Sequence, residues 1–341
     1  LFDGPASGIG SSADVARALG LPVVLVVKAE RQSHSVAALA HGFMTFDGSV
    51  NVAGVILTRV ASLRHEQMLR QALGRAGIAC LGAIGRQEGM HLSSRHLGLT
   101  IAEDNANLAE TITAIATRVE AGCDLAAIAG LSAVPPAVTP ERVEPLAPLG
   151  NRIAIAEDRA FSFAYAHLLE GWHRAGASLH PFSPLAGGAP DPAADAVFLP
   201  GGYPELHADA LAARSPWRDG LQQAAARGAL IYGECGGYMA LGKTLTDGDG
   251  NSHAMAGLLP IHTSFATRKR RLGYRTFTHD GALFPKRLKG HEFHYATIGE
   301  EGPALFEGAD SAGTALGPMG TRLGRVAGSF AHIIDVAPDA G

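Results

Sequence analysis

Apolar and polar positions in the first 130 residues form blocks whose lengths fit alternating strands and helices. Three continuous apolar runs predict strands: residues 21–27, 50–57 and 78–84. Three segments of helical character predict helices, each ending at a glycine or shortly before one: residues 12–19, 65–76 and 106–121. The β-branched run at 21–27 is typical of a strand buried on both faces. This order predicts an α/β domain with a parallel sheet.

Residues 131–150 have a different composition. Five prolines fall in this stretch: Pro135, Pro136, Pro140, Pro145 and Pro148. Proline lacks a backbone N–H and breaks helices, so the stretch is expected to link two domains. The predicted domains are therefore residues 1–130 and 151–341.

The second half alternates in the same way. Strands are predicted at residues 152–156, 196–199, 229–233 and 325–330, and a short helix at 221–227. Five side chains share the spacing of one helix face: Phe161, Tyr165, Leu168, Leu169 and Trp172. An amphipathic helix is therefore expected from 161 to 172, and both halves are expected to be α/β.

Composition limits the partners and the compartment. The 341 residues are 47% hydrophobic and carry a net charge of −4, which gives no reason to expect nucleic acid or a membrane as partner. The longest apolar run, at 22–27, is too short to span a bilayer. The three cysteines lack metal-ligand spacing, which fits a reducing cytoplasm. A chain that opens on Leu1 rather than Met is expected to be part of a longer protein.

Residues 229–239 carry the strongest candidate for chemistry. An apolar strand stops at Gly233, Cys235 follows, and Gly236 and Gly237 lead into a helical segment. This is the layout of a nucleophile elbow, where glycines permit the sharp turn and a helix N-terminus favours the thiolate. The alternative is that Cys235 is a small buried apolar residue in a strand-to-helix turn.

A thiol nucleophile needs a base and an oxyanion hole. His332 is the candidate base because it follows a late strand, and the alternative is a hydrogen-bonded core histidine. The turn at Gly201 and Gly202 offers backbone N–H groups that could join the N–H of Gly236 around an oxyanion. Alternatively, the two glycines only form a tight turn.

Two polar stretches follow the elbow. Residues 290–295 alternate like a strand and lack a third ligand with metal spacing, so they favour a polar cavity wall, with metal binding left open. Residues 268–271 are four successive cations, which favours a solvated loop over an anion site. Cys80 and Cys123 are interpreted as structural or incidental.

Several of these segments together resemble one family. Three are similar to class I glutamine amidotransferases of the cobalamin-synthesis type: residues 199–206, 233–239 and 328–332. Three more resemble cobyrinic acid or hydrogenobyrinic acid a,c-diamide synthases: residues 161–165, 272–275 and 290–295. Residues 1–4 and 94–99 are also similar to that family, so the resemblance covers essentially the whole chain.

The resemblance implies two α/β domains: an incomplete P-loop-type, dethiobiotin-synthetase-like domain and a class I glutamine amidotransferase domain. It implies that Cys235 attacks glutamine and His332 relays the proton, with the N–H groups of Gly202 and Gly236 as the oxyanion hole. In the first domain, ATP and Mg²⁺ would activate the a and c acetate carboxylates of a corrinoid acid as acyl phosphates. Ammonia would then attack them.

Further site residues follow from the same resemblance. Arg275, His291, Glu292 and His294 are the candidates for binding the corrinoid ring, and Asp3 lies on the ATP and Mg²⁺ side. The expected partners are glutamine, ATP and a corrinoid acid, and a homodimer is left open.

The sequence departs from the family pattern at three points. Ile334 occupies the position, two residues after the histidine, where the usual class I triad has Glu. No G-x-x-x-x-G-K-[ST] phosphate loop is present. Lys28 and Thr58 stand where the family often has Asp and Asn. The alternatives are a sister synthase acting on another tetrapyrrole, such as nickel-sirohydrochlorin, and a catalytically silent binding protein of the same fold.

Overall fold

A computed structural model describes residues 1–5, 8–86, 101–134, 146–299 and 301–337, without the side chain of Glu103. The chain divides into two compact units, Leu1–Pro140 and Glu141–Gly341. The motif at 94–99 and most of the predicted linker lie outside the described residues. At the end of that predicted linker, Leu146 and Leu149 are buried in the core of the second unit.

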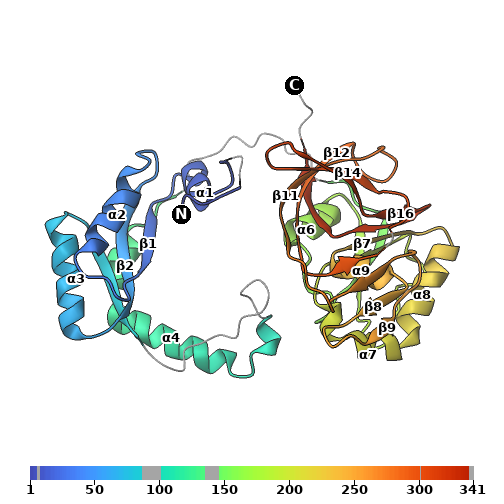
Figure 1. Cartoon of the computed structure of the whole chain (residues 1–341), viewed down its shortest axis with the longest axis horizontal. Helices are drawn as coiled ribbons and strands as arrows, with labels where there is room; N and C mark the ends of the chain where they lie inside the picture. The colour runs from blue at the N-terminus through green and yellow to red at the C-terminus, as the bar shows by residue number, and fades with distance from the viewer. Residues whose placement is uncertain (6–7, 87–100, 135–145, 300, 338–341) are drawn as a thin grey trace. The chain divides into compact units, whose positions relative to one another are not determined.

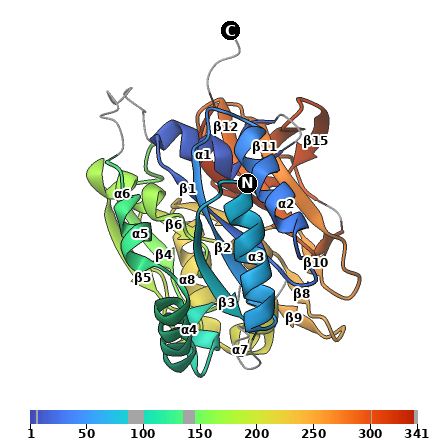
Figure 2. The same cartoon turned by 90° about the vertical axis from the view of Figure 1, so that its left-hand side faces the viewer.

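The first unit contains a three-stranded parallel sheet in the order β1-β2-β3, which confirms the predicted strands. The strands are β1 Val23–Lys28, β2 Val52–Val60 and β3 Cys80–Gly85. The helical segments are α1 Ser12–Leu19, α2 Ser35–Thr45, α3 Leu63–Arg75, the 3-10 turn η1 Ala102–Asp104, α4 Leu108–Gly122 and α5 Leu125–Gly130. Helices α2 and α3 lie side by side against the sheet (Figures 1 and 2). The three predicted helices are confirmed, and α2 and α5 are additions.

The prediction that residues 21–27 are buried on both faces is wrong. β1 is an edge strand of the described sheet, and Val26 is 63% exposed. The central strand β2 is different, because Val55 and Leu57 are fully buried between the helices and the neighbouring strands. An unbroken apolar run therefore does not by itself say that both faces are covered.

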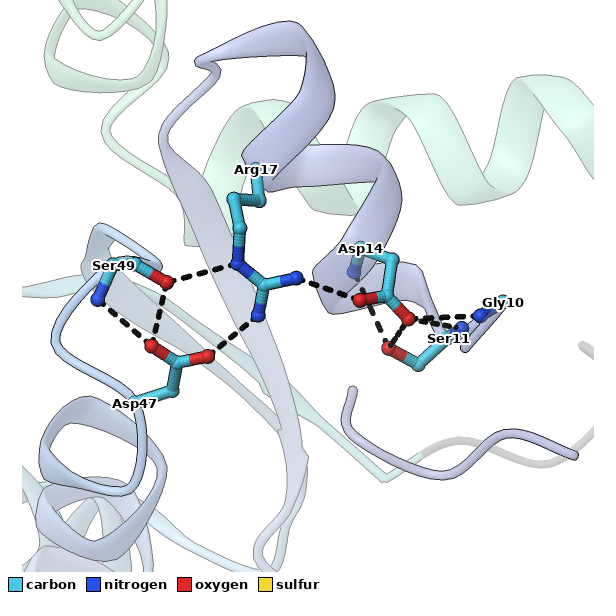
Figure 3. Close-up of polar contacts among 6 residues, drawn as sticks. All are labelled: Gly10, Ser11, Asp14, Arg17, Asp47 and Ser49. Atoms are coloured by element: carbon cyan, nitrogen blue, oxygen red, sulfur yellow. Dashed lines mark hydrogen bonds and ion pairs between the residues drawn. The ribbon is translucent and has the colours of Figure 1, made fainter. Parts of the chain in front are cut away.

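Helix α1 is held by charges at the surface of the first unit. Ser11 caps the helix, accepting from the Asp14 N–H at 3.2 Å, and the Asp14 carboxylate accepts from the Ser11 N–H at 2.8 Å. The Arg17 guanidinium bridges Asp14, at 2.6 Å, and Asp47, at 2.5 Å (Figure 3). Hydrogen bonds from Ser11 hold the pKa of Asp14 far below its usual range. This network ties the start of α1 to the loop before β2.

The second unit is built on a six-stranded sheet in the order β16-β17-β7-β6-β4-β5, parallel except for β16. Its strands are β4 Arg152–Ala156, β5 Ser178–Phe182, β6 Ala196–Leu199, β7 Leu230–Glu234, β16 Thr321–Leu323 and β17 Val326–Ser329. Its helical segments are α6 Ala166–Arg174, the 3-10 turn η2 Pro204–Leu206, α7 Ala208–Ala213, α8 Ser215–Ala226 and α9 Gly236–Leu241. The predicted strands are confirmed, and the predicted helix at 221–227 is the second half of α8.

Two smaller sheets complete this unit. A four-stranded sheet has the order β13-β10-β8-β9, with β8 Thr244–Thr246, β9 Ser252–Ala254, β10 His262–Ser264 and β13 Thr297–Ile298. A five-stranded antiparallel sheet has the order β15-β14-β11-β12-β18. Its strands are β11 Arg271–Thr278, β12 Arg287–His294, β14 Phe306–Asp310, β15 Ala315–Met319 and β18 Ala331–Val336.

Alternation along the central strands separates two cores. In β7, Ile231 faces one core with residues of α7, α8 and α9. Leu230 and Tyr232 face the other core, which contains α6 and the five-stranded sheet. Helices α6 and α8 accordingly lie on opposite sides of β7 (Figure 1). The six-stranded sheet is thus the middle of three layers, and successive residues of β7 point to different layers.

The predicted helix at 161–172 is wrong in its first half. Helix α6 begins at Ala166, and the Phe163 N–H donates to the Gly201 carbonyl at 2.9 Å as in a strand bridge. Phe161 packs into the core with α7 to α9, whereas Trp172 packs into the other. Tyr165, Leu168, Leu169 and Trp172 do pack against one core, so the predicted stripe is wrong only for Phe161.

Candidate active site

Cys235 stands between β7 and α9 in a backbone conformation that L-residues rarely adopt. Its φ is 46° and its ψ is −103°. Such a conformation costs roughly 1–3 kcal/mol and persists only where the surroundings enforce it. The Cys235 N–H donates to the Ser329 carbonyl at 2.8 Å, and its thiol to the Phe293 carbonyl at 3.9 Å. The predicted strand-turn-helix elbow is therefore formed, and Cys235 is 6% exposed.

Glycines let α9 approach the sheet closely enough to make this turn. A Cβ on Gly233 would lie 2.7 Å from the Gly237 carbonyl carbon, and one on Gly237 would overlap the Leu199 carbonyl. A Cβ on Gly328 would lie 2.6 Å from the Tyr238 ring. Larger residues at these positions would push α9 away from β6, β7 and β17.

His332 lies just after the point where the chain passes from the six-stranded sheet to the five-stranded sheet. β17 ends at Ser329 in the six-stranded sheet, and β18 begins at Ala331 in the five-stranded sheet. His332 pairs with His291 of β12, and their rings stack with centroids 4.8 Å apart. The Tyr165 ring meets the His332 ring edge-on, with ring centroids 6.5 Å apart, and the Tyr165 hydroxyl hydrogen-bonds to His291 Nε2. The imidazole of His332 is therefore held in one plane.

Gly201 separates His332 from Cys235. A Cβ on Gly201 would overlap His332 Cε1 and would lie 3.1 Å from His332 Nε2 and 3.4 Å from Cys235 Cβ. The imidazole edge that carries Nε2 and the Cys235 side chain thus border the same small space. The structure brings the two residues together, and the lack of a side chain at residue 201 is what permits it.

The two glycines expected to donate to an oxyanion also lie together. A Cβ on Gly236 would lie 2.9 Å from the Gly202 nitrogen. A Cβ on Gly202 would overlap the Ala160 carbonyl. The loop after β6 therefore lies directly against the start of α9, next to Cys235 in the chain, and the oxyanion hole stays a prediction.

Glu234 is a buried carboxyl group that the sequence analysis did not single out. It is 2% exposed, and its Oε1 accepts from the Ile333 N–H at 3.0 Å. Its Oε2 lies 3.7 Å from His332 Nδ1. The sequence signal was a charged residue at the end of a buried apolar strand, at an alternate position to Tyr232.

Burial controls the charges of this site. It raises the pKa of the Cys235 thiol to about 12, and the carboxylate of Glu205 adds to the rise. It lowers the pKa of His332 to about 3, helped by His291 and His294. It raises the pKa of Glu234 to about 8, against the Ile333 N–H, which lowers it. At neutral pH the resting site is therefore an uncharged thiol, imidazole and carboxylic acid.

The four candidates for ring binding divide between the two faces of β12. His291 faces His332, whereas Glu292 and His294, next to it along the strand, share the other face. The Glu292 carboxylate accepts from Arg275 Nε at 3.0 Å and contacts His294 Nε2 at 2.8 Å. A cavity of about 340 Å³ is lined by these three residues, with Lys269, Arg271, Glu301 and Phe330 among others. His291 therefore belongs to the Cys235 side, and the other three belong to this cavity.

The chain is similar to known glutamine amidotransferases and synthases. A family model described as the CobB/CobQ-like glutamine amidotransferase domain matches residues 152–339. The chain is 53% identical over 349 residues to the hydrogenobyrinate a,c-diamide synthase of Brucella abortus biovar 1 (strain 9-941), covering 100% of this chain and 79% of that relative. The chain belongs to the hydrogenobyrinate a,c-diamide synthase family.

Two further relatives agree. The hydrogenobyrinate a,c-diamide synthase of Rhizobium meliloti (strain 1021) is 52% identical over 338 residues, and that of Rhodobacter capsulatus is 48% identical over 346 residues. Both alignments cover 98% of this chain and 78% of the relative. As a member of this family with a glutamine amidotransferase domain, the chain is a glutamine-dependent amide-forming ligase.

The family resemblance implies ATP and Mg²⁺ in the first unit, on the side of Asp3. Asp3 is exposed, and no group of three or more His, Cys, Asp or Glu residues that could hold a metal occurs in the described parts of the chain. At the carboxyl ends of β1 to β3, Glu30 contacts Lys28 at 3.1 Å, Arg59 at 3.6 Å and Arg86 at 3.5 Å. The Glu30 carboxylate therefore neutralises part of the positive charge of these three side chains. Within the described ranges, no helix has the length and apolarity to cross a bilayer.

Proposed function

We propose that this synthase amidates the a and c acetate carboxylates of hydrogenobyrinic acid, with glutamine as nitrogen donor, in cobalamin biosynthesis. The observation that carries the proposal is 53% identity over the full length of the chain to a hydrogenobyrinate a,c-diamide synthase. The assembled Cys235 site supports the glutaminase half of the reaction, and the first unit, Leu1–Pro140, would belong to the synthase half.

In the glutaminase half, Cys235 Sγ attacks the side-chain amide carbon of glutamine. The thiol proton passes to His332 Nε2 and from there to the leaving nitrogen, so ammonia departs and a γ-glutamyl thioester remains. The N–H groups of Gly202 and Gly236 stabilise the oxyanion of the tetrahedral intermediate. Water, deprotonated by His332, then cleaves the thioester to glutamate and restores the thiol.

In the synthase half, ATP with Mg²⁺ supplies the phosphoryl group that turns a carboxylate into an acyl phosphate, which ammonia converts to an amide. Glutamine, ATP and the corrinoid acid are the small molecules that the proposal requires.

The test is to supply the intact protein with ATP, Mg²⁺ and glutamine and to weigh the products by mass spectrometry. Parallel reactions contain hydrogenobyrinic acid, cobyrinic acid or nickel-sirohydrochlorin. The proposal expects two successive amidations of hydrogenobyrinic acid. Preferential amidation of nickel-sirohydrochlorin would instead show that the protein is the sister synthase that acts on this tetrapyrrole. Absence of amidation and of glutamine hydrolysis would support a silent protein.

A further inference from the structure

The direction of Glu234 follows from the alternation of β7. Leu230 and Tyr232 point into the core shared with the five-stranded sheet, and Glu234 is the next residue of the same parity. It therefore points toward β18, the strand that carries His332. A carboxyl group in that position has no apolar packing role, and burying it is costly unless it is partnered.

The partners of Glu234 come from the histidine strand. Oε1 accepts from the Ile333 N–H at 3.0 Å, which fixes the carboxyl group one residue away from His332. Oε2 is then left 3.7 Å from His332 Nδ1. The other titratable groups that influence or adjoin it are Tyr232 on its own strand, Cys235 directly after it, and Tyr165 before α6.

We propose that Glu234 is the positioning carboxylate of His332, in place of the Glu that class I enzymes carry two residues after the histidine. The inference rests on the proposed glutaminase role of Cys235 and His332. A carboxylate at Nδ1 keeps the proton on that nitrogen and leaves Nε2 free to accept from the thiol. It also stabilises the imidazolium that forms when the proton moves.

Other groups around His332 do not supply this function. His291 stacks on the ring face rather than meeting Nδ1, and its own Nε2 is engaged by the Tyr165 hydroxyl. The residue at the usual triad position, Ile334, offers only a backbone carbonyl, which contacts His167 Nε2 at 2.9 Å. The 3.7 Å separation is one that a small shift would close to a hydrogen bond, and such bonds are often long before substrate binds.

The charge at rest is consistent with this role. Burial keeps Glu234 protonated at neutral pH while His332 is neutral, so the pair avoids an unpaired buried ion before glutamine arrives. The reactive form is the fraction of molecules in which Glu234 has already released its proton to solvent, and its carboxylate then faces the imidazolium that forms when His332 takes the thiol proton. Glu234 thus becomes a counter-ion when the histidine becomes charged.

The test compares Glu234→Gln with wild type in the intact protein. The Gln amide oxygen can still accept from the Ile333 N–H, but its NH₂ group would donate to Nδ1 and favour the wrong tautomer. We expect glutaminase kcat to fall by about 10²-fold or more with KM for glutamine within about threefold. Amidation with ammonia as donor and the melting temperature should remain near wild type. Glu170→Gln, a matched change at an exposed ion pair on α6, should leave all four quantities unchanged.

The pH profile separates positioning from packing. Wild-type kcat/KM for glutamine hydrolysis should rise up to about pH 8 as Glu234 ionises, and Glu234→Gln should lose that rise. Glu234→Asp, which keeps the carboxylate, should recover at least tenfold over Glu234→Gln. Glutaminase kcat within twofold of wild type in Glu234→Gln, or an equal loss of melting temperature and ammonia-dependent activity, would overturn the inference. A wild-type protein without glutaminase activity would instead overturn the proposed function.

Discussion

The two units differ in how completely the described residues surround their parallel sheets. In the second unit, every residue of β6 and β7 is buried, with α7, α8 and α9 on one face and α6 and the five-stranded sheet on the other. In the first unit, β1 lies at an edge and Val26 is 63% exposed.

The same difference separates their chemistry. Cys235, His332, Gly202 and Gly236 converge within the second unit, where burial sets their charges. Asp3 of the first unit is exposed, and the described parts of the chain contain no group of three or more His, Cys, Asp or Glu residues that could hold a metal. The comparison teaches that every residue of the candidate glutaminase site lies in one unit.

The sharpest way to separate the two units is Cys235→Ala. Glutamine-dependent amidation should fall by at least about 10⁴-fold because the thioester cannot form. Amidation with ammonium salts should stay within about twofold of wild type in the intact protein, since ammonia enters the reaction after the thiol has acted. Equal loss with both donors would contradict the division of labour between the units.

Gly201→Ala should damage the second unit without removing any catalytic atom. The new methyl group would overlap His332 Cε1, so the imidazole must turn away from Cys235. We expect glutaminase kcat to fall about 10²-fold, as for a displacement of about 1 Å at a catalytic group.

Gly74→Ala in α3 is the matched control in the first unit. A Cβ at Gly74 meets nothing within 4 Å, so activity should not change and the first unit should gain about 1 kcal/mol of stability. Steady-state glutaminase kinetics and thermal melts measure both. Wild-type kinetics in Gly201→Ala would show that His332 can leave this space without cost.

The smallest expected effect concerns stored strain. Cys235→Gly and Cys235→Ala both remove the thiol, but only Gly fits a φ of 46° without a Cβ clash. The free energy of unfolding of Cys235→Gly, measured by urea titration, should therefore be about 1 kcal/mol higher than that of Cys235→Ala. Equal stabilities would mean that the elbow relaxes when the thiol is absent.

Local patterns in the sequence predicted strands of both parallel sheets and the turn at Cys235, whereas the role of His332 as base stays a prediction. Cys235 lies between a five-residue buried strand and glycines that permit α9 to approach, and all of that is contiguous in the chain. The predicted start of α6 at Phe161 is wrong, because apolar spacing along the chain cannot show that Phe161 packs on the opposite side of the sheet from Trp172. The predicted burial of β1 on both faces is wrong, because an apolar run does not reveal whether a neighbouring layer covers the strand.

The remaining parts of the site depend on contacts between distant segments. Tyr165 reaches His291 across 126 residues, and Glu234 reaches Ile333 across 99. The second contact requires that the chain leave the six-stranded sheet at Ser329 and enter the five-stranded sheet at Ala331. Alternation along β7 gives the direction of Glu234, but only the register of β18 shows that a histidine lies there.

The most direct test of the central claim is labelling with 6-diazo-5-oxo-norleucine, a glutamine analogue that alkylates an active-site thiol with loss of N₂. Peptide mapping by mass spectrometry should place one adduct on Cys235, and glutamine should protect against it. Cys80 and Cys123 should remain unlabelled, because neither lies beside a glutamine site. No adduct on Cys235, or equal labelling of the three cysteines, would contradict the account.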